Sequence, residues 1–170
     1  LVANNPVYIA GIDGCRGGWI MALRQLENGI VTLRLLPRLI ELFDQPERPA
    51  MVAIDMPIGF ADTAVKGGRN CEQAARKLLP GKSSSVFSIP CRATLAATTY
   101  KEALAVNRRG NGIGLSQQAF HLLPKLRELE ALITPQRQRR LVEAHPELAF
   151  ALMNGGKPVL SRKRTAEGPR

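Results

Sequence analysis

Cysteine and long apolar runs are both scarce in this sequence. The 170 residues include three cysteines, and Cys15, Cys71 and Cys91 are too far apart to form a Cys-x-x-Cys pair. This spacing argues against a disulfide scaffold and against a zinc ribbon. Uninterrupted apolar runs are only a few residues long, which excludes a membrane span. Because no secretory signal is visible, we expect a reducing, cytoplasmic setting for the protein.

Acidic residues are few compared with basic ones. The chain has 14 Asp and Glu against 24 Lys and Arg, which gives a formal net charge of +10. Residues 1–60 carry five basic and six acidic side chains, whereas the remaining residues carry nineteen and eight. This skew favours a partner rich in phosphate, namely nucleic acid or nucleotide. An ordinary solubilising surface has the same composition and stays open as an alternative.

The first third of the chain has the pattern of a small sheet. Strands are expected at 7–13, 19–25 and 30–36, with Asn28-Gly29 as the hairpin turn before the third. In that third strand apolar and polar positions alternate, as in a half-buried strand. A short helix at 38–43 precedes the apolar run 51–55, which is typical of a central strand buried on both faces. This order predicts an α/β fold with a mixed sheet, in which a parallel fourth strand follows a three-stranded meander.

The 170 residues are long enough for one domain with its own core, and residues 61–134 are expected to form a helical insertion in it. Capping-box spacings predict two helices there, from Asn70 with Gln73 and from Thr99 with Glu102. A long helix is expected at 117–133, kinked or divided by Pro124. Its leucine stripe suits either core packing or the surface of a homodimer.

Two carboxylates follow apolar runs at matched places. Asp13 comes at the end of the first predicted strand and Asp55 at the end of the fourth. An aspartate in this position commonly does no more than cap a turn. If the two strands are parallel neighbours, however, both carboxylates emerge at the same edge of the sheet. Two such groups repel one another unless a cation or a shared proton compensates.

Further acidic and hydroxyl side chains lie in the basic part of the chain. Glu143 falls in an apolar stretch that reads as a strand, and Glu147 falls in the first turn of a helix begun by Pro146. The helix dipole by itself explains Glu147, whereas a carboxylate inside an apolar strand needs a partner. His145 suits phosphate binding, proton transfer or the orientation of a carboxylate. The serine-rich loop at 82–92 can bind phosphate, although such loops are more often plain connectors.

Five blocks of this sequence, in order, resemble the family of predicted RNase H-like nucleases known as domain-of-unknown-function family four-twenty-nine. The resemblance runs from about Tyr8 to Arg170, and the blocks are GIDGCRGGW, IDMPIGF, SSSVFSIPCRAT, GIGLSQQAFHLLPKLRELE and EAHPELAFALMNGG. It implies an RNase H-like fold, and it makes Glu143 and Glu147 of the EAHPE block members of the predicted site. Members of the family usually continue into a further Asp-rich helical region. We therefore expect this chain to be a core that lacks that last part.

These features together predict a nuclease. Asp13, Asp55 and Glu143 are expected to bind Mg²⁺ or Mn²⁺, with Glu147 as a further catalytic carboxylate, because two such ions roughly 3.5–4 Å apart stabilise a phosphodiester displacement. The side chains expected to hold the phosphates of DNA or RNA are Arg16, Lys82, Ser84, Arg92 and Lys163.

Two alternatives remain on the same fold. In the first, the protein is an actin-like ATP-binding protein whose glycine turn at 14–18 approaches the phosphates. In the second, it binds nucleic acid without cutting it, and the carboxylates are structural. Binding that falls steeply with salt but is insensitive to metal would favour the second alternative over the nuclease.

Overall fold

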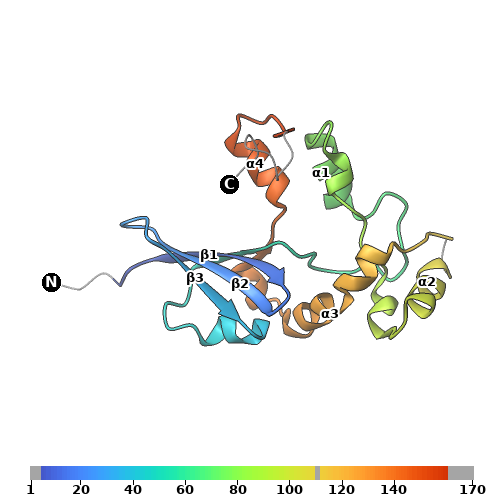
Figure 1. The fold of residues 1–170 in the computed structure, drawn as a ribbon, viewed down its shortest axis with the longest axis horizontal. Helices are drawn as coiled ribbons and strands as arrows, with labels where there is room; N and C mark the ends of the chain where they lie inside the picture. The colour runs from blue at the N-terminus through green and yellow to red at the C-terminus, as the bar shows by residue number, and fades with distance from the viewer. Residues whose placement is uncertain (1–4, 110–111, 161–170) are drawn as a thin grey trace. The chain divides into compact units, whose positions relative to one another are not determined.

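The computed structural model describes residues 5–109 and 112–160. The chain divides into two compact units (Figure 1). The first unit consists of Leu1–Ile58 and Pro124–Ala144, and the second of Gly59–Leu123 and His145–Arg170. The first unit contains the sheet, and the second is built mainly from short helices.

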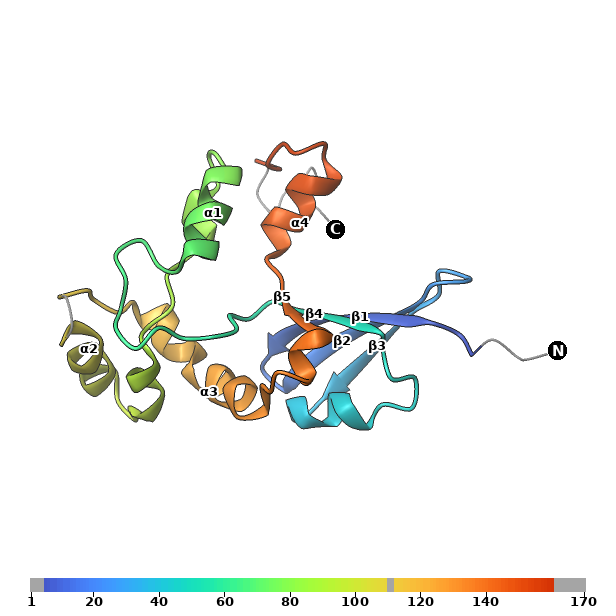
Figure 2. The same cartoon turned by 180° about the vertical axis from the view of Figure 1, so that it is seen from behind.

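The first unit is a five-stranded mixed sheet in the order β3-β2-β1-β4-β5. The three N-terminal strands form an antiparallel meander, and β4 and β5 extend it in parallel from β1. Figure 2 shows β4 between β1 and β5. The predicted meander with a parallel fourth strand is confirmed, and the protein is a mixed α/β protein. The strands are β1 (Tyr8–Cys15), β2 (Gly18–Gln25), β3 (Val31–Leu36), β4 (Met51–Ile54) and β5 (Leu141–Glu143).

The predicted hairpin at Asn28-Gly29 is confirmed. Gly29 has a φ of +72°, a conformation that favours glycine, and the Asn28 Oδ1 atom accepts a hydrogen bond of 2.9 Å from the Ile30 N–H. The Gln25 N–H donates to the Ile30 carbonyl oxygen at 3.0 Å, which closes the turn between β2 and β3. Local turn chemistry therefore sets the register of this pair of strands.

One face of the sheet carries the core of the first unit. Alternate residues of the strands are buried there, as the two-residue period of a strand requires. The short 3-10 helix η1 (Leu39–Asp44) adds Leu39 and Leu42 to this core, and the end of α3 adds Leu126 and Leu129. The buried strand residues on this face are Ala10, Ile12, Trp19, Met21, Leu23, Leu36, Val52, Ile54 and Leu141.

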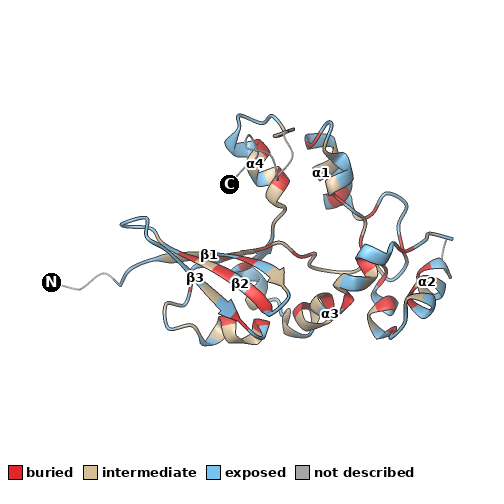
Figure 3. Cartoon of the chain, viewed as in Figure 1, coloured by how far each residue is buried: buried red, intermediate tan, exposed pale blue. Residues whose placement is uncertain are grey.

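The other face is exposed, and this corrects two expectations. Figure 3 marks most of β3 as exposed, and its apolar residues Val31, Leu33 and Leu35 are 55%, 67% and 56% exposed. The apolar residues of β3 therefore lie on the open face of the sheet, and not on the face that carries the core. The β4 strand is predicted to be buried on both faces, yet Met51 is 43% exposed while Ile54 is fully buried. Since the covering segments lie on one side only, these strands are half-buried.

The second unit has its own small core. Leu79, Val86 and Ala151 form it, with Ala75 and Leu148 packed against them. These residues come from three parts of the chain that are distant in sequence. The elements of this unit are α1 (Asn70–Leu78), η2 (Ser83–Ser85), η3 (Arg92–Ala96), α2 (Tyr100–Arg108) and α4 (Pro146–Met153).

Helix starts agree with the sequence in one case and differ in another. At α2 the Thr99 Oγ1 atom accepts from the Glu102 N–H at 3.2 Å, which confirms Thr99 as the N-cap, and the Glu102 carboxylate reaches back one residue further, to the Thr98 N–H at 2.8 Å. The helix α1 begins at Asn70, but its capping box pairs Arg69 with Glu72, one residue earlier than the predicted pair of Asn70 with Gln73. The Glu72 carboxylate reaches back to the Arg69 N–H at 3.1 Å, because Arg69 occupies the N-cap position.

The long helix α3 (Gln117–Leu132) runs through Pro124 without dividing, from the second unit into the first. Its stripe of Leu123, Leu126 and Leu129 is at most 1% exposed, so these side chains serve the interior. The homodimer predicted for this helix gains no support from that burial. Among the described residues, no helix is both long and apolar enough to cross a membrane.

Candidate functional site

Asp13 and Asp55 are neighbours on adjacent parallel strands. Ile12 of β1 is in register with Ile54 of β4, and the Asp55 N–H donates to the Ile12 carbonyl oxygen at 2.9 Å. Asp13 directly follows Ile12, and Asp55 directly follows Ile54. The register continues beyond them, since Met56 Cε lies 3.6 Å from where a Cβ on Gly14 would be. The tertiary structure therefore brings these two carboxylates together, as the sequence predicted for parallel strands.

Both aspartates belong to the open face of the sheet. Side chains alternate along a strand, and Ile12 and Ile54 point into the core. Asp13 is accordingly exposed, and Asp55 is half-buried. A phosphate or a hydrated cation can reach this position from solvent.

The glycine-rich stretch after Asp13 is a tight hairpin. The expected strand end at Asp13 is wrong, because β1 continues to Cys15, which pairs with Gly18 and leaves Arg16 and Gly17 as a two-residue loop. Gly18 has a φ of +130°, and a Cβ there would lie 2.2 Å from the Leu36 carbonyl oxygen. Glycine is thus required by the turn itself. Arg16 lies at the exposed tip of this loop.

Glu143 does not share the face of the two aspartates. It is in register with Ile54, one position before Asp55, so strand alternation directs it to the opposite side of the sheet. Its Oε2 atom accepts a hydrogen bond of 2.9 Å from the Ile58 N–H. Glu143 therefore holds the loop that follows Asp55.

The other predicted residues gather in the second unit, around the serine-rich loop. Glu147 is buried and pairs with Lys82, whose Nζ atom is 3.8 Å from the Glu147 Oε2 atom. The His145 Nε2 atom lies 3.2 Å from the Ser85 carbonyl oxygen. The buried Nδ1 atom of His145 has no hydrogen-bond partner among the residues that the structure describes. Ser84 is exposed in the same loop.

Arg92 and Lys163 complete the predicted set. Arg92 is exposed at the start of η3, and its guanidinium carbon lies 5.9 Å from the centre of the Phe60 ring. Lys163 lies outside the described residues. The predicted residues thus form two groups. Asp13, Asp55, Glu143 and Arg16 belong to the first unit, and Lys82, Ser84, Arg92 and Glu147 belong to the second.

Sequence reasoning missed a cation beside the first group. Lys125 of α3 donates from Nζ to the Gly18 carbonyl oxygen, and Nζ lies 4.6 Å from the centre of the Trp19 ring. The Lys125 side chain also packs 3.7 Å from where a Cβ on Gly14 would be, an ordinary van der Waals distance. One turn later on the same helix, the Glu128 carboxylate accepts from the Trp19 Nε1–H at 2.8 Å. No pattern within the helix signals this contact, because Lys125 and Gly18 are 107 positions apart in the chain.

In the described ranges, the side chains of His, Cys, Asp and Glu form no cluster of three or more suited to a metal ion. The pair Asp13 and Asp55 offers carboxylate oxygens, the ligand type that hard cations prefer. Mg²⁺ is often held by only one or two carboxylates, with waters and substrate phosphates as the other ligands.

Comparisons with known proteins give a family but no closer relative. No curated protein and no solved structure matches the chain. A family model described as "Protein of unknown function (DUF429)" matches residues 11–170, so the chain belongs to that family.

Proposed function

We propose that this protein is a metal-dependent nuclease with an RNase H-like core, hydrolysing phosphodiester bonds of DNA or RNA. The observation that carries the proposal is the register of Asp13 beside Asp55 on the open face of the sheet. Carboxylate pairs in this arrangement repel one another in water, and a divalent cation relieves that repulsion. The basic excess of the chain supplies attraction to a polyanion.

In this proposal Asp13 and Asp55 hold Mg²⁺ or Mn²⁺. The bound ion would stabilise the charge that develops on the phosphodiester oxygens during displacement. Glu143 is a positioning residue, because its hydrogen bond from the Ile58 N–H fixes the loop after Asp55. Arg16, exposed at the tip of the adjoining hairpin, binds a neighbouring phosphate of the strand.

The residues of the second unit act on the substrate rather than on the metal. Glu147 is engaged by Lys82 and buried, so its role in this proposal is to position that ammonium group. Ser84 and Arg92 are exposed and can donate hydrogen bonds to the nucleic acid backbone. These two residues would raise the affinity for nucleic acid, and this gain in affinity would decrease as the salt concentration rises.

Cleavage assays with an Asp13→Asn variant test this proposal. Purified protein with Mn²⁺ or Mg²⁺ is incubated with single-stranded, duplex and branched DNA and with RNA. Cleavage should be lost in Asp13→Asn and retained in Asp44→Asn, which makes the same change at an exposed aspartate of η1. Cleavage that persists in Asp13→Asn, or no cleavage of any substrate, would overturn the proposal.

The same protein sample discriminates the alternatives. Calorimetry with Mg²⁺ and ATP that gives micromolar binding without cleavage would favour the nucleotide-binding protein. Gly18 of the hairpin gives the nucleotide-binding alternative no support, because the turn itself requires glycine at that position. Nucleic acid binding that is steeply salt-dependent but unaffected by metal would favour a binding protein without catalysis.

A further inference from the structure

A cleft of about 310 Å³ opens in the first unit, between η1 and the start of β4 and β5. Its floor is apolar and includes Leu42, Phe43, Val52 and Leu141. Val52 and Leu141 are register partners on the buried face of the sheet. The aspartates lie on the open face, and Asp55 is three residues further along the chain than Val52, so this cleft is separate from the proposed catalytic site.

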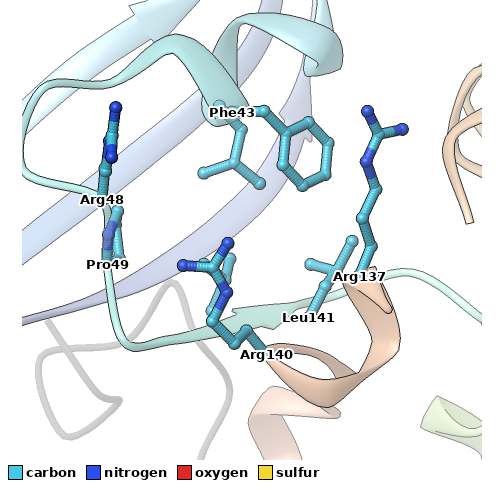
Figure 4. Close-up of a pocket in the computed structure, with 8 residues that line it drawn as sticks. Phe43, Arg48, Pro49, Arg137, Arg140 and Leu141 are labelled. Carbon is cyan, nitrogen blue, oxygen red and sulfur yellow. The ribbon is translucent and has the colours of Figure 1, made fainter. Parts of the chain in front are cut away.

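Three arginines stand around this apolar floor (Figure 4). Arg48 and Arg137 lie on opposite sides of the Phe43 ring, and Arg140 lies between them in that view. They come from two segments that are far apart in the sequence, the loop before β4 and the turn η4 (Arg137–Arg139) with the residue that follows it. The lining residues include neither aspartate nor glutamate.

Each guanidinium has a different degree of constraint. Arg137 is fixed, because its Nη1 atom donates to the Leu132 carbonyl oxygen at 2.9 Å and its guanidinium carbon lies 4.1 Å from the centre of the Phe43 ring. Arg48 and Arg140 are exposed, and neither has a side-chain hydrogen bond or ion pair to another described residue. The nearest acid in the sequence, Glu47, is already bound to Arg34. Two exposed guanidiniums with unused donors thus line the cleft beside a third that is held in place.

The backbone of Arg48 supports the same reading. Its φ is +44°, and Arg48 is the one residue other than glycine with positive φ among the described residues. Side chains other than glycine are strained in this region, and such strain persists only where the surroundings impose it. A glycine would adopt this backbone conformation with less strain, but it would bring no guanidinium to the cleft that Arg48 lines.

We propose that this cleft binds a phosphate monoester of mononucleotide size. Its volume is at the lower end of the range for small-molecule pockets, about 300–1,000 Å³, and exceeds what a bare phosphate needs. A monoester carries nearly two negative charges at neutral pH, which three guanidiniums with no lining acid can balance. Guanidinium groups also match the oxygens of phosphate in geometry. The apolar floor would contact the nucleoside part of the ligand.

Calorimetry on the full chain tests the site with AMP and UMP as probes, and with adenosine and inorganic phosphate as controls. At least one mononucleotide should bind more tightly than either control, because only the mononucleotide uses both the guanidiniums and the floor. Arg48→Gln and Arg140→Gln should each weaken that binding about tenfold or more, the usual effect of losing a charge-assisted hydrogen bond.

Matched variants make the outcome decisive. Arg24→Gln removes an exposed arginine of β2 outside the cleft and should leave the affinity unchanged. Asp13→Asn should also leave it unchanged, so this result and that of the cleavage assay are independent. The proposal is overturned if neither mononucleotide binds, if inorganic phosphate binds as tightly as they do, or if Arg24→Gln has the same effect as the cleft variants. Circular dichroism of each variant checks that the fold is intact.

Discussion

The tight hairpin next to Asp13 allows a stability prediction that separates two costs. A Cβ at position 18 would lie 2.2 Å from the Leu36 carbonyl oxygen and 2.8 Å from two Pro37 backbone atoms, at a φ of +130°. Real Cβ atoms do not approach backbone this closely, so β2 and the residues after β3 must move apart. Gly18→Ala therefore carries both a steric cost and a conformational cost.

The two costs can be separated by comparing Gly18 with two other glycines, Gly29 and Gly11. Gly29 has a φ of +72° but open space where a methyl group would be added, with one Arg24 nitrogen atom 3.9 Å away. Gly29→Ala should thus cost only the conformational part, about 1 kcal/mol after the gain from a less flexible unfolded chain. Gly18 has a φ of +130°, outside the left-handed region that other residues tolerate, so its conformational cost is at least as large as that of Gly29. Overpacking against backbone adds about 1–3 kcal/mol, for a total of at least about 3 kcal/mol. Gly11 has neither a positive φ nor a neighbour within 4 Å, so Gly11→Ala should be neutral or slightly stabilising.

Urea unfolding of the three variants measures these free energies. Thermal melts should shift by roughly 2–4 °C per kcal/mol for a chain of this size, which puts the Gly18→Ala loss near 6–12 °C. The order Gly18, Gly29, Gly11 in decreasing cost is the essential result. If Gly18→Ala costs no more than Gly29→Ala, the close approach of β2 to Leu36 and the hairpin geometry beside Asp13 are both refuted.

Two further predictions concern the sheet and its ion pairs. Leu33→Ala should change the free energy of unfolding by less than about 0.5 kcal/mol because Leu33 is 67% exposed, whereas Leu23→Ala on the buried face should cost about 2–5 kcal/mol. Equal costs in urea unfolding would mean that both faces of β2 and β3 are covered. The hydrogen bond from Arg34 lowers the pKa of Glu47, so this pair contributes stability above the ordinary pKa of glutamate, about 4.3, and loses it as pH falls. Unfolding measured between pH 7 and pH 3 should show a smaller acid loss in Glu47→Gln than in the parent, and identical pH profiles would contradict the pairing.

Local chemistry explains the features that the sequence predicted well. The turn at Asn28-Gly29 and the cap at Thr99 each depend on residues within four positions of one another, so the relevant contacts can be read from neighbours in the chain. The cap of α1 shows the limit of this reading. Asn70 has good capping chemistry, yet the N-cap position is occupied by Arg69, whose N–H donates to the Glu72 carboxylate.

The open face of the sheet could not be predicted from alternation. The β3 strand has an apolar side made of Val31, Leu33 and Leu35, and a strand pattern assigns such a side to the core. In the structure the segments that cover the sheet, η1 and the end of α3, lie on the other side. Which side is covered depends on where a helix much later in the chain packs, and no period within β3 contains that information.

The sequence by itself determined that Asp13 and Asp55 each follow an apolar strand segment, because strand pattern and strand length are local properties. Only the tertiary structure decided that β1 and β4 pair in a register that makes the two aspartates neighbours, and that Glu143 faces the opposite side. It also decided that Arg48 and Arg140 share one cleft. These groupings join segments from distant parts of the chain, so they depend on how the whole sheet packs and not on the preferences of any one segment.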